Sequence, residues 1–195
     1  MPEVIQQFDE QALVWIAQNI RSGLLDPLMT IYTKLGDAGL LFIALGLVLL
    51  LFKSTRKAGF SALCAMIIGL VVVNFTIKPL MARDRPWLVI EGFVNLVEEH
   101  DPNSFPSGHT NAAFAFALAL CVAAPRRWMK ITAVCMAAVM GLSRLYVGVH
   151  FPSDVLVGAL TGSLCGLLGA WVVKIAWERL EPRFRKAPEP PPDVE

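Results

Sequence analysis

The stretch PSGHTNAAFAFALALCVAA (Pro106–Ala124) joins a short polar turn to a long uncharged run. No charged residue occurs from Thr110 to Pro125, and alanine, leucine and phenylalanine dominate. A surface helix in water needs a polar face, so an uncharged run of this kind is typical of a helix buried in protein or lipid. We therefore predict a helix over residues 110–124, with small polar groups and a histidine at its N-terminal end.

The composition of the whole chain is more apolar than a soluble domain of this length requires. Of its 195 residues, 55% are hydrophobic and 17% are charged, and the mean hydropathy is +0.57. A soluble fold of this size needs more polar surface. We predict an all-α integral membrane protein that forms one domain. With a net charge of +1 and no basic stripe, nucleic acid is not an expected partner.

Four other apolar segments approach the length of a membrane-spanning helix, which is about 20 residues. Together with the first segment they predict five spans, at residues 36–52, 58–77, 110–124, 131–149 and 152–177. Lysines and arginines gather in the loops at one end of this bundle, at Lys53, Arg56, Lys57, Arg126, Arg127 and Lys130. The positive-inside rule makes that end cytoplasmic and the opposite end, where acidic residues prevail, extracytoplasmic.

The segments outside the bundle, which covers residues 36–178, are expected to be peripheral. Residues 1–35 predict short amphipathic helices at the membrane interface, with Trp15 suited to the headgroup level. If residues 10–33 cross the membrane instead, the bundle has six spans. The N-terminus lacks the basic and apolar regions of a cleavable signal peptide. Residues 179–195 form a basic and then proline-rich tail that we expect to be disordered.

Small residues are frequent within the predicted spans. The four cysteines, Cys64, Cys121, Cys135 and Cys165, all fall in spans and are expected to be buried thiols, not disulfides. The last span carries Gly158, Gly162, Gly166, Gly169 and Ala170, which permit close helix packing within the bundle or between chains. The oligomeric state therefore stays open.

Charged and polar residues interrupt the apolar pattern at one end of the predicted bundle. They are Lys78, Arg85, Ser107, Gly108, His109, Ser143, Arg144, His150 and Asp154. The alternating direction of the spans places them all at the extracytoplasmic end. An arginine inside a span is unfavourable and normally faces a polar cavity. Each residue has an ordinary structural explanation on its own, but their coincidence favours one site.

The residue types in this set suit chemistry on a phosphate group. Lys78, Arg85 and Arg144 supply three cations, and arginine matches phosphate oxygens with paired N–H groups. The turn that contains Gly108 opens a helix, whose N-terminal N–H groups attract an anion. A histidine near a carboxylate, His150 with Asp154, suits an oriented nucleophile. The second histidine, His109, could act as general acid.

Three segments together resemble the signature motifs of the type 2 phosphatidic acid phosphatase family. KPLMARDRP (Lys78–Pro86) matches K-x6-RP, and PSGH (Pro106–His109) matches the second motif. SRLYVGVHFPSD (Ser143–Asp154) matches SR-x5-H-x3-D. All three occur in order and without departure, which is a specific signal, whereas PSGH alone would be a weak one.

The resemblance implies a helical membrane enzyme that hydrolyses phosphate esters or anhydrides without a metal or other cofactor. By motif position, His150 is the nucleophile that becomes a phosphohistidine, Asp154 orients it, and His109 protonates the leaving group. The residues implied to hold the phosphoryl oxygens are Lys78, Arg85, Ser107, Gly108 and Arg144.

The membrane location points to a lipid phosphate or diphosphate as substrate. The bacterial members of similar size imply a multi-pass protein of the cytoplasmic (inner) membrane, with its site on the extracytoplasmic side. Undecaprenyl diphosphate is the substrate we favour, because an outward-facing site fits recycling of that carrier. A broad phosphatidate or phosphatidylglycerophosphate phosphatase would share every motif residue.

Functions of other classes use parts of the same pattern. A phosphotransferase would replace water with an alcohol, and a non-hydrolytic lipid binder or transporter would need only the cations. A vanadate-dependent haloperoxidase shares the motifs, but those relatives are soluble. The acidic loop 87–105 is expected to be a rim or lid with solvated charges. A cation site built from its Glu98, Glu99, His100 and Asp101 lacks the ligand spacing of a strong metal motif.

Overall fold

A computed structural model describes residues 1–184 of the chain, with side chains as far as Leu180. Nearly all regular structure in this part is helical, and one isolated bridge joins Asp84 to Asn103. The helices are α1 (Glu3–Asn19), α2 (Leu25–Leu35), the 3₁₀ turn η1 (Asp37–Gly39), α3 (Leu40–Leu51), α4 (Arg56–Gly69), the π-helical segment η2 (Leu70–Ile77), α5 (Lys78–Met81), α6 (Pro86–Val89), α7 (Gly108–Ala123), α8 (Arg127–Tyr146) and α9 (Pro152–Phe184). The all-α prediction is confirmed.

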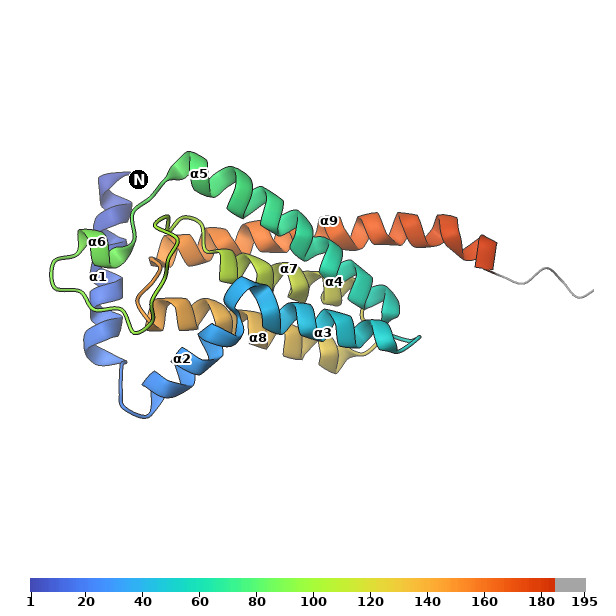
Figure 1. Cartoon of the computed structure of the whole chain (residues 1–195), viewed down its shortest axis with the longest axis horizontal. Coiled ribbons are helices and arrows are strands. Elements are labelled where there is room, and N and C mark those ends of the chain that lie inside the picture. Colours follow the sequence, from blue (N-terminus) through green and yellow to red (C-terminus); the bar gives the residue numbers. More distant parts are fainter. Residues whose placement is uncertain (185–195) are drawn as a thin grey trace, which may run out of the picture.

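The five apolar segments predicted as spans all form helices, which run side by side as an elongated bundle (Figure 1). Among the described residues, three segments are long and apolar enough to cross a membrane: Arg56–Met81, Arg127–Tyr146 and Pro152–Leu180. The pair Leu25–Leu35 and Asp37–Leu51, bent by 53°, makes a fourth if it is one broken span. The remaining helix, α7, is apolar but shorter, with 16 residues.

The N-terminal helix α1 lies across one end of the bundle (Figure 1). Its exposed side includes Val4, Phe8 and Trp15, while Asp9 and Leu13 are buried against the bundle. This orientation fits the amphipathic helix that the sequence predicts. Because α1 ends at Asn19 and α2 begins at Leu25, the stretch 10–33 is not one helix, and α2 is instead continued by α3.

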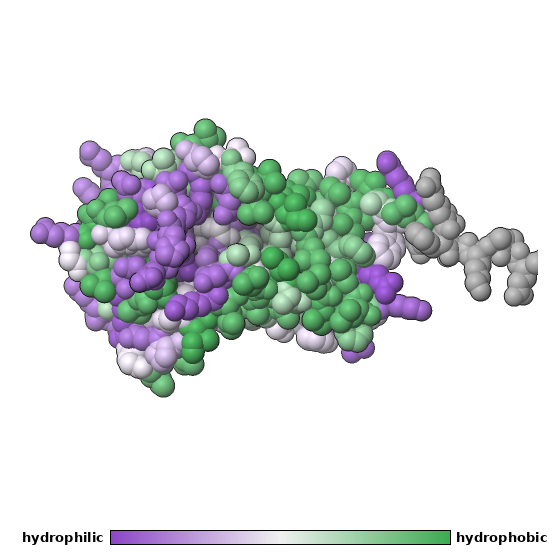
Figure 2. Space-filling model, viewed as in Figure 1, coloured by the Kyte–Doolittle hydropathy of each residue, from purple (hydrophilic) through white to green (hydrophobic). Residues whose placement is uncertain are grey.

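The surface of the molecule is divided into an apolar band and polar ends. On the face seen in Figure 2, hydrophobic residues cover the bundle, with a large polar region over α1 and the neighbouring loops and a smaller one at the opposite end. Leu47, Phe75, Leu156, Leu160 and Leu164 are among the large exposed apolar side chains of the bundle helices. An apolar band of this kind is the surface that a bilayer covers, so the chain is a multi-pass membrane protein.

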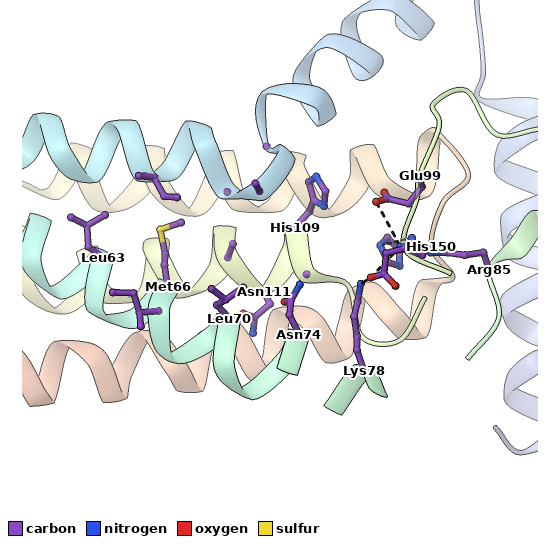
Figure 3. Close-up of a pocket in the computed structure, with 18 residues that line it drawn as sticks. Leu63, Met66, Leu70, Asn74, Lys78, Arg85, Glu99, His109, Asn111 and His150 are labelled. Atoms are coloured by element: carbon purple, nitrogen blue, oxygen red, sulfur yellow. Dashed lines mark hydrogen bonds and ion pairs between the residues drawn. The ribbon is translucent and has the colours of Figure 1, made fainter. Parts of the chain in front are cut away.

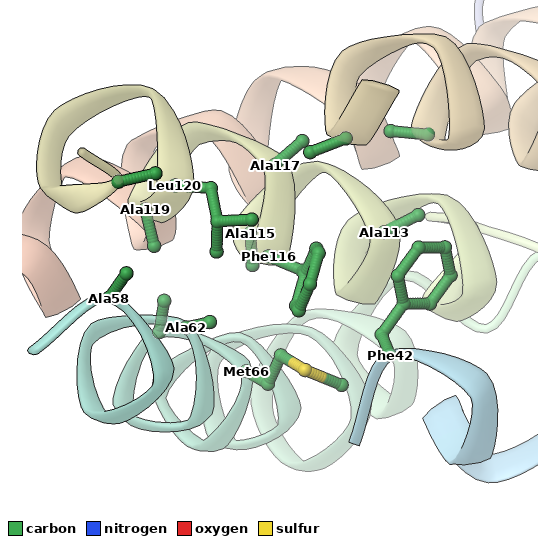
Figure 4. Packing of buried hydrophobic residues seen from close by; sticks show 14 of the residues in the cluster. Phe42, Ala58, Ala62, Met66, Ala113, Ala115, Phe116, Ala117, Ala119 and Leu120 are labelled. Carbon is green, nitrogen blue, oxygen red and sulfur yellow. The ribbon is translucent and has the colours of Figure 1, made fainter. Parts of the chain in front are cut away.

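Small residues bring α4, α7 and α9 into close contact at the centre of the bundle. Figure 4 shows Ala58 and Ala62 of α4 facing an alanine-rich side of α7 around Phe116. A Cβ on Gly169 would lie 2.6 Å from the Cα of Ala65. Gly158, Gly162 and Gly166 approach α7 in the same way. The small residues of the last span therefore serve packing within the bundle.

Two sequence-based expectations need correction. Helix α9 continues to Phe184, so the tail does not begin at residue 179 as predicted, and its proline-rich part lies outside the described residues. The four cysteines are free thiols, but only Cys165 is fully buried and Cys135 is exposed. Cys135 lies on α8, on the side turned away from the other helices, where a thiol faces lipid without penalty.

Candidate active site

All eight predicted site residues meet at the α1 end of the bundle. Lys78 begins α5, and Arg85 precedes α6. Ser107 caps α7, and Gly108 and His109 form its first turn. Arg144 lies in the last turn of α8, His150 in the connection after it, and Asp154 in the first turn of α9. The ionisable members are deeply buried, since Arg85, Arg144 and His150 are each 1% exposed.

The start of α7 is fixed to α9 through Ser107. Its backbone N–H donates to the carbonyl oxygen of Asp154 over 3.0 Å, and its Oγ accepts from the hydroxyl of Thr110 over 2.9 Å. Gly108 faces η2, where an added Cβ would lie 3.3 Å from the side-chain amide of Asn74. The glycine thus lets the polar turn approach η2, which ends at Ile77, directly before Lys78.

The ring of His150 lies between the carboxylate of Asp154 and the guanidinium of Arg85. Its Nδ1 lies 3.5 Å from Oδ2 of Asp154, and that oxygen also accepts the backbone N–H of Phe151 at 2.8 Å. Its Nε2 lies 3.1 Å from Nη1 of Arg85. A guanidinium has no acceptor, so Nε2 accepts this hydrogen bond and the ring proton is on Nδ1, facing Asp154.

The electrostatic surroundings keep His150 neutral. Burial lowers the pKa of its imidazole well below the ordinary value, and the positive charges of Arg85, Arg144 and Lys78 lower it further. A neutral imidazole with its lone pair on Nε2 is the form that can attack an electrophile.

Two carboxylates of the acidic loop occupy the cation cluster. Glu99 forms an ion pair with Arg144, and Asp101 forms one with Lys78. Arg85 lies 3.8 Å from Glu99 and 3.9 Å from Asp101. The expectation that these loop charges are solvated is therefore wrong for Glu99, whose side chain is 20% exposed, whereas Asp101 is paired but remains 39% exposed. Three cations buried together need compensating anions, which explains why the loop folds inward.

The sequence also offered a weak cation site in this loop, but two of its carboxylates, Glu99 and Asp101, pair with basic side chains instead. Among residues 1–184, no three histidine, cysteine, aspartate or glutamate side chains gather as a metal site requires, the group from Glu98 to Asp101 included. The loop is also fastened to the first motif, since Arg85 Nε donates to the carbonyl of Asp101 over 3.0 Å.

His109, in the first turn of α7, lines the same cavity as His150. Its Nε2 is 2.9 Å from Oδ1 of Asp37, a half-exposed carboxylate in the turn η1. The sequence pattern did not single out Asp37, which is one of the acidic residues at this end of the bundle. Its partnership with His109 depends on the sharp break between α2 and α3, where Ala38 has a φ of 50°.

Other residues that the sequence did not single out support the motif residues. The hydroxyl of Thr33 on α2 accepts from Nη1 of Arg144 over 2.7 Å. Arg83 donates from Nη1 to Oδ1 of Asp154 over 2.5 Å and from Nη2 to Oδ2 of Asp9 over 2.8 Å. Arg83 stands inside the first motif at an unspecified position. Asp9 lies on the same helix face as Leu13, four residues away, and both are buried. A charged residue on the apolar side of a helix is a sequence signal for a buried ion pair.

A cavity of about 670 Å³ connects this polar cluster to an apolar region between α3, α4 and α7. Its polar end is lined by Lys78, Arg85, His109 and His150, and Asn74 and Asn111 lie farther in (Figure 3). The apolar end is lined by Ile43, Leu63, Met66, Ile67 and Leu70. Glu99 and Asp101 also line the polar end and pair with its cations, so a ligand that fills this space needs an anionic head that can replace these carboxylates, and an apolar body.

Comparison with known proteins agrees with this arrangement. The family model described as PAP2 superfamily matches residues 58–181. The undecaprenyl-diphosphatase of Sulfolobus acidocaldarius is 33% identical over 148 residues, 76% of this chain and 70% of the relative. Phosphatidylglycerophosphatase B of Bacillus subtilis is 33% identical over 192 residues, 93% of this chain and 89% of the relative. The crystal structure of Aquifex aeolicus LpxE has a TM-score of 0.73 at 30% identity, covering 83% of this chain and 94% of that one.

The chain therefore belongs to the PAP2 superfamily, as its three motifs indicated. It is a membrane phosphatase of that family.

Proposed function

We propose that this chain hydrolyses a lipid phosphomonoester or diphosphate through a phosphohistidine, and that undecaprenyl diphosphate is its physiological substrate. The observation that supports a lipid substrate is the continuity of the cavity. Lys78 and Arg85 line the cavity, and Arg144 is paired with the lining residue Glu99. A phosphoryl group bound by these cations would leave its hydrocarbon chain beside Met66 and Leu70.

In the proposed first step, Nε2 of His150 attacks phosphorus and the bond to the leaving oxygen breaks. His109 donates a proton to that oxygen, so the lipid leaves in a stable form. The three cations and the N-terminal end of α7, at Ser107 and Gly108, stabilise the charge on the phosphoryl oxygens. Asp154 accepts a hydrogen bond from the Nδ1–H and stabilises the positive charge that forms on the ring of His150, without taking the proton.

In the second step, water attacks the phosphorus of the phosphohistidine and the N–P bond breaks. His109, now neutral, accepts a proton from that water. Inorganic phosphate leaves, and His150 returns to its neutral form. Glu99 and Asp101 would have to release the cations when substrate binds and return when phosphate leaves.

Two observations support undecaprenyl diphosphate as the substrate. One is the likeness to the Sulfolobus undecaprenyl-diphosphatase, and the other is the end of the bundle at which the motif residues lie. The basic loops around Lys53 and Arg126 lie between helices at the end opposite the site. The positive-inside rule would then turn the site outward from the cytoplasmic membrane, where a polyprenyl diphosphate is released after its cargo is transferred.

A second candidate substrate is phosphatidylglycerophosphate. The likeness to phosphatidylglycerophosphatase B extends over 93% of this chain, which favours this reading specifically. The apolar end of the cavity accommodates hydrocarbon of either kind, so the choice depends on measurement.

The test is phosphate release by the purified protein in detergent with EDTA, from undecaprenyl diphosphate, phosphatidylglycerophosphate and phosphatidate in parallel. A preference of tenfold or more, roughly, for the polyprenyl diphosphate supports the proposal. Equal turnover of all three moves the function to general lipid dephosphorylation. Loss of the lipid phosphate only when an alcohol is added, with the phosphate ester of that alcohol formed in place of inorganic phosphate, would indicate a transferase. Loss of phosphate from none of the lipids would contradict the proposed hydrolysis.

A further inference from the structure

Helix α1 carries a buried aspartate, Asp9, that contacts residues outside the helix. Asp9 is 1% exposed, although it belongs to an amphipathic helix at the surface of the bundle. Its Oδ1 accepts the backbone N–H of Ser153 over 3.0 Å, and its Oδ2 accepts from the hydroxyl of Ser153 and from Arg83. Burial of a carboxylate is unfavourable unless it is paired, so these contacts hold α1 against the start of α9.

Arg83 joins this carboxylate to the catalytic end of the bundle. Its Nη2 donates to Asp9 over 2.8 Å and to Oε1 of Gln6 over 2.7 Å. Its Nη1 donates to Oδ1 of Asp154 over 2.5 Å and to the hydroxyl of Ser153 over 2.8 Å. The guanidinium also lies 4.0 Å from the centre of the Phe151 ring. A fork held on both sides and on one face has a fixed position.

The contacts form a continuous chain from α1 to the proposed nucleophile. Oδ1 of Asp154 takes the hydrogen bond from Arg83, and Oδ2 faces Nδ1 of His150 at 3.5 Å. Along this chain, Asp9 and Asp154 are each at most 1% exposed, and the side chain of Arg83 is 8% exposed. Water screens charges weakly at such positions.

We propose that Arg83 and Asp9 are positioning residues of the phosphatase, acting on His150 through Asp154. This inference rests on the proposed roles of His150 and Asp154. Arg83 neutralises the repulsion between two buried carboxylates and keeps Asp154 ionised and aimed at Nδ1. Asp9 balances part of the charge of Arg83, so that Asp154 retains enough negative charge to stabilise the imidazolium that forms on attack.

Helix α1 would then be more than a peripheral helix, because its Asp9 would help to position the catalytic residues. Loss of Arg83 would leave Asp9 and Asp154 as close like charges, and one of them would take up a proton or turn away. The other ionisable groups near Asp154, besides Asp9, are His150 and Arg85, and neither forms the bridge that Arg83 forms. The phosphate-binding cations do not contact Asp9, so the effect should fall on the chemical step.

The test compares Asp9→Asn, Arg83→Gln and the double variant with the full-length wild type in detergent. Glu3→Gln is the matched control, an exposed acid-to-amide change on the same helix. The kcat and KM for phosphatidate micelles, or for undecaprenyl diphosphate if phosphatidate is not turned over, and inhibition by vanadate are measured on folded protein.

We expect kcat to fall about 100-fold in Arg83→Gln and about tenfold in Asp9→Asn, the range seen when supporting hydrogen-bond partners are removed. The KM and the vanadate inhibition constant should stay within about threefold of wild type, because Lys78, Arg85 and Arg144 are intact. The double variant should be no slower than Arg83→Gln alone, since both changes break one chain of contacts. Arg83→Lys, which keeps the charge, should recover part of kcat.

A merely structural role predicts a lower melting temperature with wild-type kcat per folded molecule, and that result would overturn the inference. If Arg83→Gln does not fold, wild-type kcat in both Arg83→Lys and Asp9→Asn would overturn it equally. His150→Ala, tested alongside, separates the two proposals. Turnover in that variant contradicts the proposed function, whereas an inactive His150→Ala with wild-type kinetics in Asp9→Asn contradicts only the role of α1.

Discussion

Arg85 Nη1 lies 3.1 Å from Nε2 of His150, so a residue of the first motif donates a hydrogen bond to the atom that would attack phosphorus. This contact fixes the tautomer of the ring in the free site, because the guanidinium can only donate. An arriving phosphoryl group would place its oxygens near the same guanidinium. Arg85 would then turn from His150 to the phosphate, and Nε2 would become free as the electrophile arrives.

Replacement of His150 by alanine should abolish phosphate release in the presence of EDTA. Loss of a covalent nucleophile typically reduces kcat by about 10⁴-fold or more. The change removes a buried ring, so the helical content and the gel-filtration profile are compared with the wild type. Retained turnover by correctly folded His150→Ala would remove the proposed nucleophile.

The imidazole of His150 should titrate well below its ordinary pKa of about 6.5. Burial and the cations around it disfavour the protonated form, so the folded ring stays neutral as the pH falls through 6.5 or so while the unfolded ring takes up a proton. Stability should therefore decline on acidification below about that pH. Nitrogen NMR of labelled histidine in detergent measures the titration, with His150→Ala to assign the signal.

A matched variant tests the cause of that shift. Lys78→Met removes one of the positive charges that lower the pKa of His150, so the titration midpoint should move upward. An unchanged midpoint would mean that Lys78 does not contribute to the lowered pKa of His150, which would then depend on burial and on the other cations.

Replacement of Arg144 by lysine should lower kcat/KM by about 100-fold or more, the effect of removing one preorganised donor from a transition state. Lysine keeps the charge but cannot contact Thr33 and an oxyanion with a rigid fork as arginine can. Inhibition by vanadate should weaken in parallel. Unchanged vanadate inhibition would show that Arg144 does not contact the phosphoryl group.

Replacement of Glu99 by glutamine should strengthen anion binding. The carboxylate of Glu99 pairs with Arg144 in the free site and competes with phosphate for it. We expect the vanadate inhibition constant to fall about threefold to tenfold, the equivalent of about 1 kcal/mol for a partly exposed ion pair. Glu98→Gln is the neighbouring control. A vanadate inhibition constant higher than that of the wild type in Glu99→Gln would contradict this competition and would mean that the carboxylate helps to hold the site in its binding arrangement.

Replacement of Leu70 by tryptophan should discriminate between lipid and water-soluble substrates. The larger side chain would fill part of the apolar end of the cavity, far from His150. The KM for a long-chain lipid phosphate should rise about tenfold, on the order of the effect of a few lost methylene contacts. Turnover of p-nitrophenyl phosphate should not change. Leu164→Trp, at an exposed leucine of α9 outside the cavity lining, is the control.

The sequence was sufficient to predict the helical bundle and the motif residues of the site. Long uncharged runs leave few alternatives to buried or membrane helices, and the three motifs fix an order of residues that alternating spans must bring to one end. The boundary between the segments 1–35 and 36–52 was predicted close to the break at η1. The 53° bend at this boundary, the positive φ of Ala38 and the contact of Asp37 with His109 were not predictable in this way.

The positions of the loop and of α1 were also beyond the sequence pattern. Glu99 and Asp101 belong to an acidic, irregular segment, for which solvent exposure is the usual outcome. Their placement on Arg144 and Lys78 follows from the need to compensate buried cations, a tertiary requirement that no local periodicity encodes. Asp9 reaches Arg83 across 74 residues of sequence for the same reason.

The central claim is that the phosphoryl group is transferred to Nε2 of His150. The most direct measurement is rapid quenching of His109→Ala with p-nitrophenyl phosphate, followed by mass spectrometry of the peptide that contains His150. This leaving group needs little protonation, so the first step should proceed while the loss of His109 slows hydrolysis. We predict an acid-labile phosphate on His150 that accumulates with a burst of nitrophenol. A burst with phosphate on another residue, or steady release of phosphate with His150 unmodified throughout, would contradict the account.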